Sequence, residues 1–314
     1  MNYKNYTTEQ EILQDGKNEW KGKKLKTETL AYIYKQIGML AKSERVDKCG
    51  TYLEFAKSQE GIKKLSQANF CKVMLCPMCA WRRSKKIFGQ VSKIMDELEK
   101  GKYKFIFLTL TIRNCKGEDL KENIDLLMKS FDRMFKRPSM SFIKGWFRGL
   151  EITYNEQENT YHPHFHCVLA VKPSYFTSRD YVKQMEWVRI WQECLKVDYE
   201  PNVDIRTVKT NAKNIKKTVA EVAKYTVKDS DYLKENNLKL SETLVKTIDE
   251  ALFKRRLVAF GGRFKELHKE LNLDDAEDGN LIDINGDEIR EDLDFVIEKY
   301  SWFNGVAGRN YYKL

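Results

Sequence analysis

Three of the four histidines in this chain of 314 residues lie in one short segment, YHPHFHCVLAV (161–171). The apolar residues that end the segment predict a buried strand. Alternate side chains of a strand point to the same face, so His164 and His166 project together and could bind one metal ion. His162 has the same parity, but Pro163 interrupts the strand, and we interpret His162 as a substrate contact rather than a ligand.

A neighbouring strand must supply a third ligand, because two protein ligands rarely hold a metal ion alone. The segment WFRGLEITY (146–154) is a predicted strand, and a short polar loop joins it to the histidine strand as in a hairpin. Glu151 is its only carboxylate. Two histidines and one carboxylate suit Mg²⁺ or Mn²⁺. The alternative, ordinary surface histidines at a strand end, leaves the carboxylate opposite them unexplained.

A second group of reactive side chains lies on a helix predicted over about 212–228. Glu221 and Tyr225 are four residues apart and share a face that lies off the apolar stripe. A tyrosine oxygen beside a carboxylate and among lysines suits phosphoryl transfer through a phosphotyrosine. The ordinary role of such a tyrosine is packing, and Tyr232 is a competing nucleophile that we rank lower. The flanking lysines are Lys217, Lys224 and Lys228.

Four of the seven cysteines follow the spacing C-x21-C-x4-C-x2-C, ending in a CPMC turn. Such a turn directs two thiolates at one ion, which predicts a structural Zn²⁺ site, with free buried thiols as the alternative. An odd cysteine count without an apolar N-terminal signal argues for an intracellular chain. A basic helix start follows, which we interpret as a contact to duplex phosphate. The cysteines are Cys49, Cys71, Cys76 and Cys79, and the basic residues are Arg82, Arg83, Lys85 and Lys86.

The charge of the chain favours a phosphate-rich partner. Lysine and arginine number 56 against 46 acidic residues, a net charge of +10. Residues 272–294 are strongly acidic, so the remainder is more basic than the total indicates. Ordinary solubility charge explains the excess equally well. No apolar run is long enough to span a membrane.

The elements that position these residues alternate in the order β-α-β-β-α-β-α. This order is typical of a split α+β fold, a central antiparallel sheet with helices packed mainly on one face. N-terminal to it, we expect residues 1–26 to be loose and a helix over 27–42 to be capped by Thr27. The predicted strands and helices of the alternation are 104–112, 118–136, 146–154, 164–171, 178–195, 202–209 and 212–228.

We divide the chain into four parts. An N-terminal helical extension precedes a Cys-rich segment that binds zinc and DNA, and a catalytic domain precedes an α/β C-terminal extension. In that extension, Asn285-Gly286 predicts a hairpin turn. The parts are 1–45, 46–86, 87–235 and 236–314.

Three segments resemble the motifs of HUH endonucleases, and more narrowly those of the rolling-circle replication initiator (Rep) proteins of bacterial plasmids. They are FLTLTIRN (107–114), HFH (164–166) and EVAKYTVKDSDY (221–232), and AFGGRFKELHKEL (259–271) is also similar to the plasmid family. The resemblance covers roughly residues 45–310. It implies the HUH fold and a set of DNA contacts at Thr109, Thr111, Arg113, Asn114, Lys224 and Lys228.

The resemblance also implies a reaction. In that family a metal on the histidine pair polarises the scissile phosphate, and a tyrosine cuts one strand at the origin. The tyrosine stays on the 5′ end and leaves a 3′-OH for a polymerase. These roles correspond to Tyr225 and, for hydrolytic release at termination, to Glu221. A glutamate base favours irreversible hydrolysis, whereas a phosphotyrosine conserves the phosphodiester energy.

The implied partners are double-stranded origin DNA, single-stranded DNA, a host helicase and the replicative polymerase, in a bacterial cytoplasm. The oligomeric state stays open. One alternative is another HUH enzyme, a mobilisation relaxase or a single-strand transposase. The other is a non-catalytic zinc-containing DNA-binding regulator, which leaves the histidine strand without a role. The spacing of Glu221 and Tyr225 and the Cys-rich segment favour the initiator.

Overall fold

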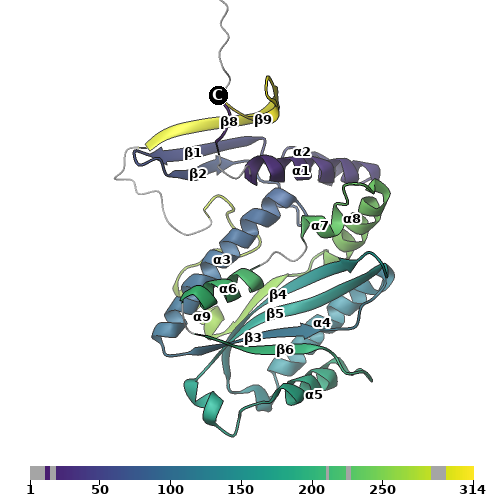
Figure 1. Ribbon diagram of the computed structural model, residues 1–314, viewed down its shortest axis with the longest axis vertical. Coiled ribbons are helices and arrows are strands. Elements are labelled where there is room, and N and C mark those ends of the chain that lie inside the picture. The colour runs from purple at the N-terminus through teal and green to yellow at the C-terminus, as the bar shows by residue number, and fades with distance from the viewer. Residues whose placement is uncertain (1–10, 15–18, 210–211, 224–227, 284–294) are drawn as a thin grey trace, which may run out of the picture. The chain divides into compact units, whose positions relative to one another are not determined.

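The computed structural model describes residues 11–14, 19–209, 212–223, 228–283 and 295–314 (Figure 1). The chain forms two compact units, Met1–Arg82 with Leu281–Leu314, and Arg83–Asn280. The predicted extension over 236–314 is therefore divided between the two units. Within the described ranges, no helix combines the length and the apolar character needed to cross a membrane.

The second unit is built on an antiparallel sheet of five strands in the order β6-β3-β5-β4-β7. Helix α4 (Leu120–Phe135) connects β3 to β4, α5 (Gln184–Leu195) connects β5 to β6, and α6 (Ala212–Val222) follows β6. The predicted β-α-β-β-α-β-α order and the α+β class are thus confirmed. The strands are β3 (Lys104–Thr111), β4 (Ile143–Asn155), β5 (Thr160–Val171), β6 (Val203–Val208) and β7 (Val258–Gly262).

The motif AFGG forms the edge strand β7, which pairs with β4. A side chain at Gly261 would overlap the indole ring of Trp146, and one at Gly145 would lie 2.8 Å from the backbone nitrogens of Arg263 and Phe264. The glycines therefore allow β4, β7 and α9 (Arg263–Glu270) to pack closely. This segment belongs to the central sheet and not to a separate extension.

Helices cover both faces of this sheet, which corrects the expectation that they pack mainly on one (Figure 1). Helices α3 (Pro77–Lys100), α6 and α9 share a core with Phe107 and Val168 on one face. On the other face Phe131 of α4 packs edge-on against Phe165, and α5 packs against α4. Strand β5 is apolar at consecutive positions, as expected of a strand buried on both sides.

Short elements connect these layers. The predicted helix over 178–195 begins only at Gln184, because residues 178–183 form a turn and irregular backbone that follow the 3-10 turn Pro173–Thr177. The remaining elements are the 3-10 turns Gly117–Asp119, Pro138–Met140 and Pro173–Thr177 and the helices α7 (Asp229–Tyr232) and α8 (Leu238–Leu252).

The first unit contains a second antiparallel sheet, in the order β2-β1-β8-β9. Its strands are β1 (Tyr52–Ser58), β2 (Lys63–Ala68), β8 (Phe295–Gly305) and β9 (Gly308–Lys313), and its helices are α1 (Glu19–Gln36) and α2 (Leu40–Asp47). Trp20 of α1 packs edge-on against Phe55 of β1. Helix α3 begins in this unit at Pro77 and continues into the second.

Two predictions for the first unit are wrong. Helix α1 begins at Glu19 rather than at residue 27, and Thr27 lies inside it with its hydroxyl donating to the Lys23 carbonyl. The described residues before 27 are therefore not all loose. The predicted hairpin turn at Asn285-Gly286 lies outside the described residues, whereas a hairpin that we did not predict joins β8 to β9.

Candidate metal centre

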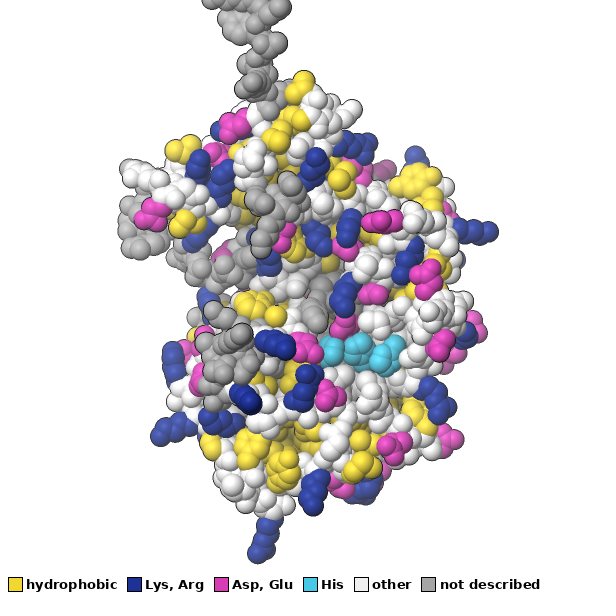
Figure 2. Space-filling view, in the orientation of Figure 1, with side chains coloured by type: hydrophobic (Ala, Val, Ile, Leu, Met, Phe, Trp, Pro, Cys, Tyr) yellow, Lys and Arg dark blue, Asp and Glu magenta, His cyan; other side chains and the backbone are white. Residues whose placement is uncertain are grey.

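Sheet register brings the three predicted ligands together. Glu151 on β4 lies directly opposite His164 on β5, and His166 projects from the same face two residues on. The Nε2 atoms of the two histidines are 3.2 Å apart, and the Glu151 Oε2 lies 2.9 Å from that of His166 and 3.6 Å from that of His164. Figure 2 shows the histidine side chains of this face as one continuous row.

The donor set fits a divalent cation. One ligand atom from each of the three residues lies within 4.8 Å of the others. The Nδ1 of His164 is 3.0 Å from the His162 carbonyl, and the Nδ1 of His166 is 3.2 Å from the Thr109 hydroxyl. Such outer hydrogen bonds orient imidazole ligands, and here they leave both Nε2 atoms facing the carboxylate. The group could therefore hold a metal ion.

The electrostatics of the group favour an ionised carboxylate. Burial alone raises the pKa of Glu151, but hydrogen bonds and charge from His164 and His166 lower this pKa well below its usual range. The Lys228 ammonium lies 3.3 Å from the Glu151 Oε1. Beside the group, burial and the neighbouring His164 lower the pKa of His162 to about 4. The His162 ring is thus uncharged at neutral pH.

The C-terminal end of α6 approaches the sheet beside these ligands. Gly149 pairs with His166 across the sheet, and a Cβ atom at Gly149 would lie 2.9 Å from the Val222 carbonyl oxygen. The hydroxyl of Ser84 on α3 donates to the next carbonyl, that of Ala223, at 2.8 Å. Because Gly149 has no side chain, the end of α6 can lie close to β4 beside His166.

Glu221 lies near the group but is not one of its three donors. Its carboxylate is 3.4 Å from the Arg206 guanidinium of β6, and 26% of its side chain is exposed. Arg206 also bonds Asp204 at 2.8 Å and lies over the Phe107 ring, whose centroid is 5.6 Å from that of His166. Glu221 is thus held at the edge of the sheet face that bears the ligands.

The tyrosine predictions have different outcomes. Tyr225 and Lys224 lie outside the described residues. Tyr232 is described, ends the short helix α7 and is 1% exposed. Its ring is part of the packing.

The predicted contacts in the first motif lie around the end of β3. Thr109 bonds the ligand His166, and the Thr111 hydroxyl is buried and donates to the Asn202 carbonyl at 2.8 Å. Arg113 and Asn114 are exposed. The two threonines therefore support the framework, whereas the arginine and the asparagine are accessible to DNA.

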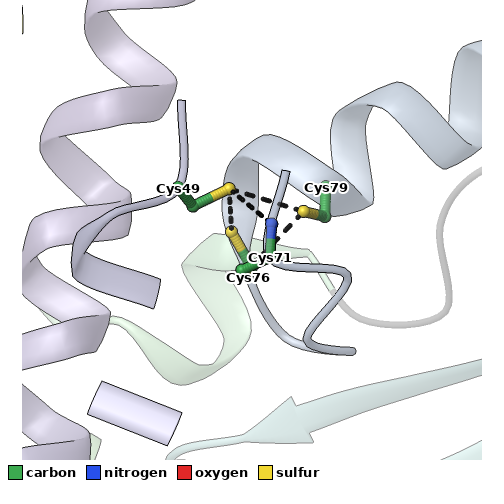
Figure 3. Close-up of side chains that lie close together, drawn as sticks. All are labelled: Cys49, Cys71, Cys76 and Cys79. Carbon is green, nitrogen blue, oxygen red and sulfur yellow. Dashed lines mark hydrogen bonds between the residues drawn. The ribbon is translucent and has the colours of Figure 1, made fainter. Parts of the chain in front are cut away.

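The four cysteines of the first unit converge, as Figure 3 shows. The Cys49 Sγ lies 3.5 Å from that of Cys79 and 3.6 Å from that of Cys76, and the Sγ atoms of Cys71 and Cys79 are 3.7 Å apart. Four thiolates around a tetrahedral zinc, each at about 2.3 Å, have edges of about 3.8 Å. The cluster therefore has the dimensions of a metal site.

Backbone geometry supports this arrangement of sulfurs. The nitrogen of Lys72, a residue with a positive φ of 57°, donates to the Cys79 Sγ at 3.3 Å, and the Cys71 nitrogen donates to the Cys49 Sγ at 3.4 Å. Donors that point at sulfur stabilise thiolates. The predicted set of four cysteines is thus preorganised to hold a cation.

The basic start of α3 has a structural role, which corrects the prediction that it contacts DNA. Arg82 is 5% and Arg83 1% exposed, and they donate to the carbonyls of Leu281 and Glu277, respectively. Lys86 is 2% exposed and bonds Asp274 at 2.6 Å. These cationic groups bond backbone carbonyls and one carboxylate within residues 274–282, and all three are buried away from solvent. Lys85 is half-buried.

Comparison with known proteins identifies the class. The model of the replication-protein family Rep_1 matches residues 62–311, and the chain belongs to this family. Proteins named "Protein rep" from Streptococcus pneumoniae serotype 2 and from Bacillus amyloliquefaciens are 43% and 42% identical to it. The alignments cover 84% and 94% of this chain and 82% and 94% of those proteins.

These findings support a plasmid replication initiator and confirm the resemblance to the plasmid Rep proteins. No solved structure matches the chain.

Proposed function

We propose that the chain is a metal-dependent DNA nickase of the HUH type that starts rolling-circle replication by forming a 5′-phosphotyrosine through Tyr225. The observation that carries this proposal is the convergence of Glu151, His164 and His166 on one face of an antiparallel sheet. A purely DNA-binding regulator has no use for a buried carboxylate aimed at two imidazole nitrogens.

The donor set suits Mg²⁺ or Mn²⁺, which when bound would stabilise charge on the scissile phosphate and align it for in-line attack. The Tyr225 oxygen attacks phosphorus and loses its proton. The bond from phosphorus to the 3′ oxygen breaks, and that oxygen takes up a proton and leaves as a 3′-OH. One phosphodiester is exchanged for another, so the later strand-joining step needs no external energy source.

The described residues on either side of 224–227 support Tyr225 as the nucleophile. Before this segment, Val222 approaches Gly149 beside His166, and after it, Lys228 lies 3.3 Å from Glu151. Both contacts are made with β4, within two positions of each other along the strand. The ammonium of Lys228 also provides a cation for the DNA phosphate.

Glu221 is proposed to activate water at termination, and the cysteine cluster is proposed to hold a structural Zn²⁺. The enzyme would act on the double-strand origin and on single-stranded DNA in the bacterial cytoplasm. It would pass the 3′-OH to the replicative polymerase once a host helicase has opened the duplex.

Covalent capture tests the proposal. Purified protein is incubated with labelled single-stranded fragments that tile the plasmid origin, with and without Mg²⁺ or Mn²⁺. We expect a metal-dependent adduct that maps to Tyr225 and is lost in Tyr225→Phe but retained in Tyr232→Phe. Binding without cleavage at any metal concentration would support the regulator instead.

A further inference from the structure

An open pocket of about 430 Å³ lies at the end of β3. Its volume is within the range of small-molecule sites, about 300–1,000 Å³. The nicking chemistry proposed above assigns no role to the residues that line it. Its lining includes Thr111, Arg113, Asn114, Glu158, His162, Tyr199, Glu200 and Asn202.

The pocket adjoins the candidate metal centre through two residues. The His162 ring stacks on the ring of the ligand His164, with centroids 4.8 Å apart and planes inclined by 24°. Thr111, on the pocket wall, is the register partner of His164 on the neighbouring strand. A ligand in this pocket would therefore lie next to a group bound at the metal centre.

One wall is a preformed flat surface. The Arg113 guanidinium carbon lies 4.0 Å from the centroid of the Tyr199 ring, and the Tyr199 hydroxyl accepts a hydrogen bond from the Arg113 backbone nitrogen at 3.1 Å. This second contact fixes the ring without using the guanidinium group. Unpaired bases stack on such aromatic and guanidinium planes in proteins that bind single-stranded nucleic acid.

The charge of the pocket selects a base over a phosphate. Among the described residues of its lining, two are carboxylates, Glu158 and Glu200, and one is a cation, Arg113. The carboxylates disfavour a phosphate group but accept hydrogen bonds from the N–H groups of a base edge. The exposed amides of Asn114 and Asn202 add polar groups that distinguish one edge from another.

We propose that this pocket binds one unpaired base of the single-stranded substrate, adjacent to the scissile phosphate, and contributes to sequence choice at the nick. The base stacks on the Arg113–Tyr199 pair, and its edge is read by Glu158 and the two amides. This inference rests on the proposed nicking function, because that function supplies single-stranded DNA at the neighbouring metal centre.

A thermodynamic cycle tests the pocket. The probe is an oligonucleotide that the wild-type protein cleaves, prepared as a series with one abasic position each. Affinity is measured by fluorescence anisotropy in the Tyr225→Phe background, with and without Tyr199→Ala. We expect one abasic position beside the nick to weaken binding roughly 5- to 150-fold when Tyr199 is present and to have no further effect with Tyr199→Ala. Tyr199→Phe should restore most of the coupling.

A matched pair of variants tests base reading without disturbing a ring. Glu158 and Glu156 are both exposed on the loop between β4 and β5, but only Glu158 lines the pocket. Glu158→Gln should change the preferred base at the coupled position alone, and Glu156→Gln should leave the preference unchanged.

Independent, additive losses from Tyr199→Ala and from each abasic position would overturn the pocket proposal, even if cleavage is normal. So would an unchanged base preference in Glu158→Gln. If the wild-type protein cleaves no origin fragment with any metal, the proposed function itself fails, and the two failures are thereby distinguished.

Discussion

The Val222 carbonyl oxygen lies 2.9 Å from the point that a Cβ atom would occupy at Gly149, the residue paired with His166. Alanine at position 149 would therefore push the end of α6 away from the ligands. We expect nicking to fall by about 10- to 100-fold, because a 1 Å misplacement at a reacting centre costs about that much. The measurement is single-turnover cleavage at saturating DNA.

Gly22 provides the control for this substitution. It lies in α1, and among the described residues nothing outside the helix's own backbone lies within 4 Å of an added Cβ. Gly22→Ala should leave nicking unchanged and stabilise the helix by about 0.5–1 kcal/mol. Equal nicking by Gly149→Ala and the wild-type protein would mean that the approach of α6 to β4 does not position the reactive segment.

Removal of either imidazole should abolish metal-dependent cleavage. In His164→Ala or His166→Ala only two of the three convergent donors remain, whereas duplex binding has no need of them. Glu151→Ala should affect the metal dependence of cleavage less severely than either histidine variant, because water can replace a carboxylate ligand. Cleavage titrated against Mg²⁺ and Mn²⁺ measures these effects. A wild-type rate for either histidine variant across the titration would show that the ligand assignment is wrong.

The cysteine cluster should contain one zinc per chain. Thiolate ligation of zinc contributes to folding free energy, so chelation should lower the melting temperature of the protein. Cys49→Ser should remove the metal and destabilise the chain, whereas Cys115→Ser, at a cysteine outside the cluster, should retain it. Elemental analysis measures the metal, and a zinc-free protein with unchanged stability would contradict the assignment.

The basic residues at the start of α3 should affect stability rather than DNA binding. Arg83 is buried and donates to the Glu277 carbonyl at 2.9 Å, and hydrogen bonds from charged groups contribute about 1.5–3 kcal/mol. Arg83→Met should lower the free energy of unfolding by about that amount. The slope of log affinity against log salt should stay constant, because no phosphate contact is lost. A flatter slope would show that Arg83 does contact DNA phosphate.

The features of the fold that could be predicted are those whose residues lie close together along the chain. The period of two residues in a strand was enough to place His164 and His166 on one face, and a short hairpin brought Glu151 opposite them. The role of Arg83 could not be read in this way, because its partner Glu277 lies 194 residues away. The same is true of the sheet in the first unit, where Tyr52 pairs with Ser301.

One missed feature did have a local signal. Strand β5 is apolar at consecutive positions from Cys167 to Val171, which indicates burial on both faces. A sheet covered on one face only would show alternation there. This run was evidence against our expectation of helices mainly on one face, and it agrees with the helices that cover both faces in the structure.

Glu221 and Tyr225 should divide termination from initiation, and Arg206 should position Glu221 for its part. The 3.4 Å contact with Arg206 holds the Glu221 carboxylate on the side of the sheet that bears the ligands. Glu221→Ala should still nick and form the adduct, because the metal ligands and Tyr225 remain. Hydrolytic release should fall by about 10²–10⁴-fold, the usual contribution of a general base. Multimeric single-stranded products in a plasmid replication assay would be the signature.

Arg206→Ala should reproduce part of this release defect. Arg206→Lys should retain more hydrolytic release than Arg206→Gln, because an ammonium can still pair with the Glu221 carboxylate. A purely structural role for Arg206 would lower nicking and release equally, so the ratio of the two rates is the decisive measurement. Glu221 would belong to the first step if Glu221→Ala lost nicking as fully as Tyr225→Phe. Its pairing with Arg206 rather than with the ligand group argues against that result.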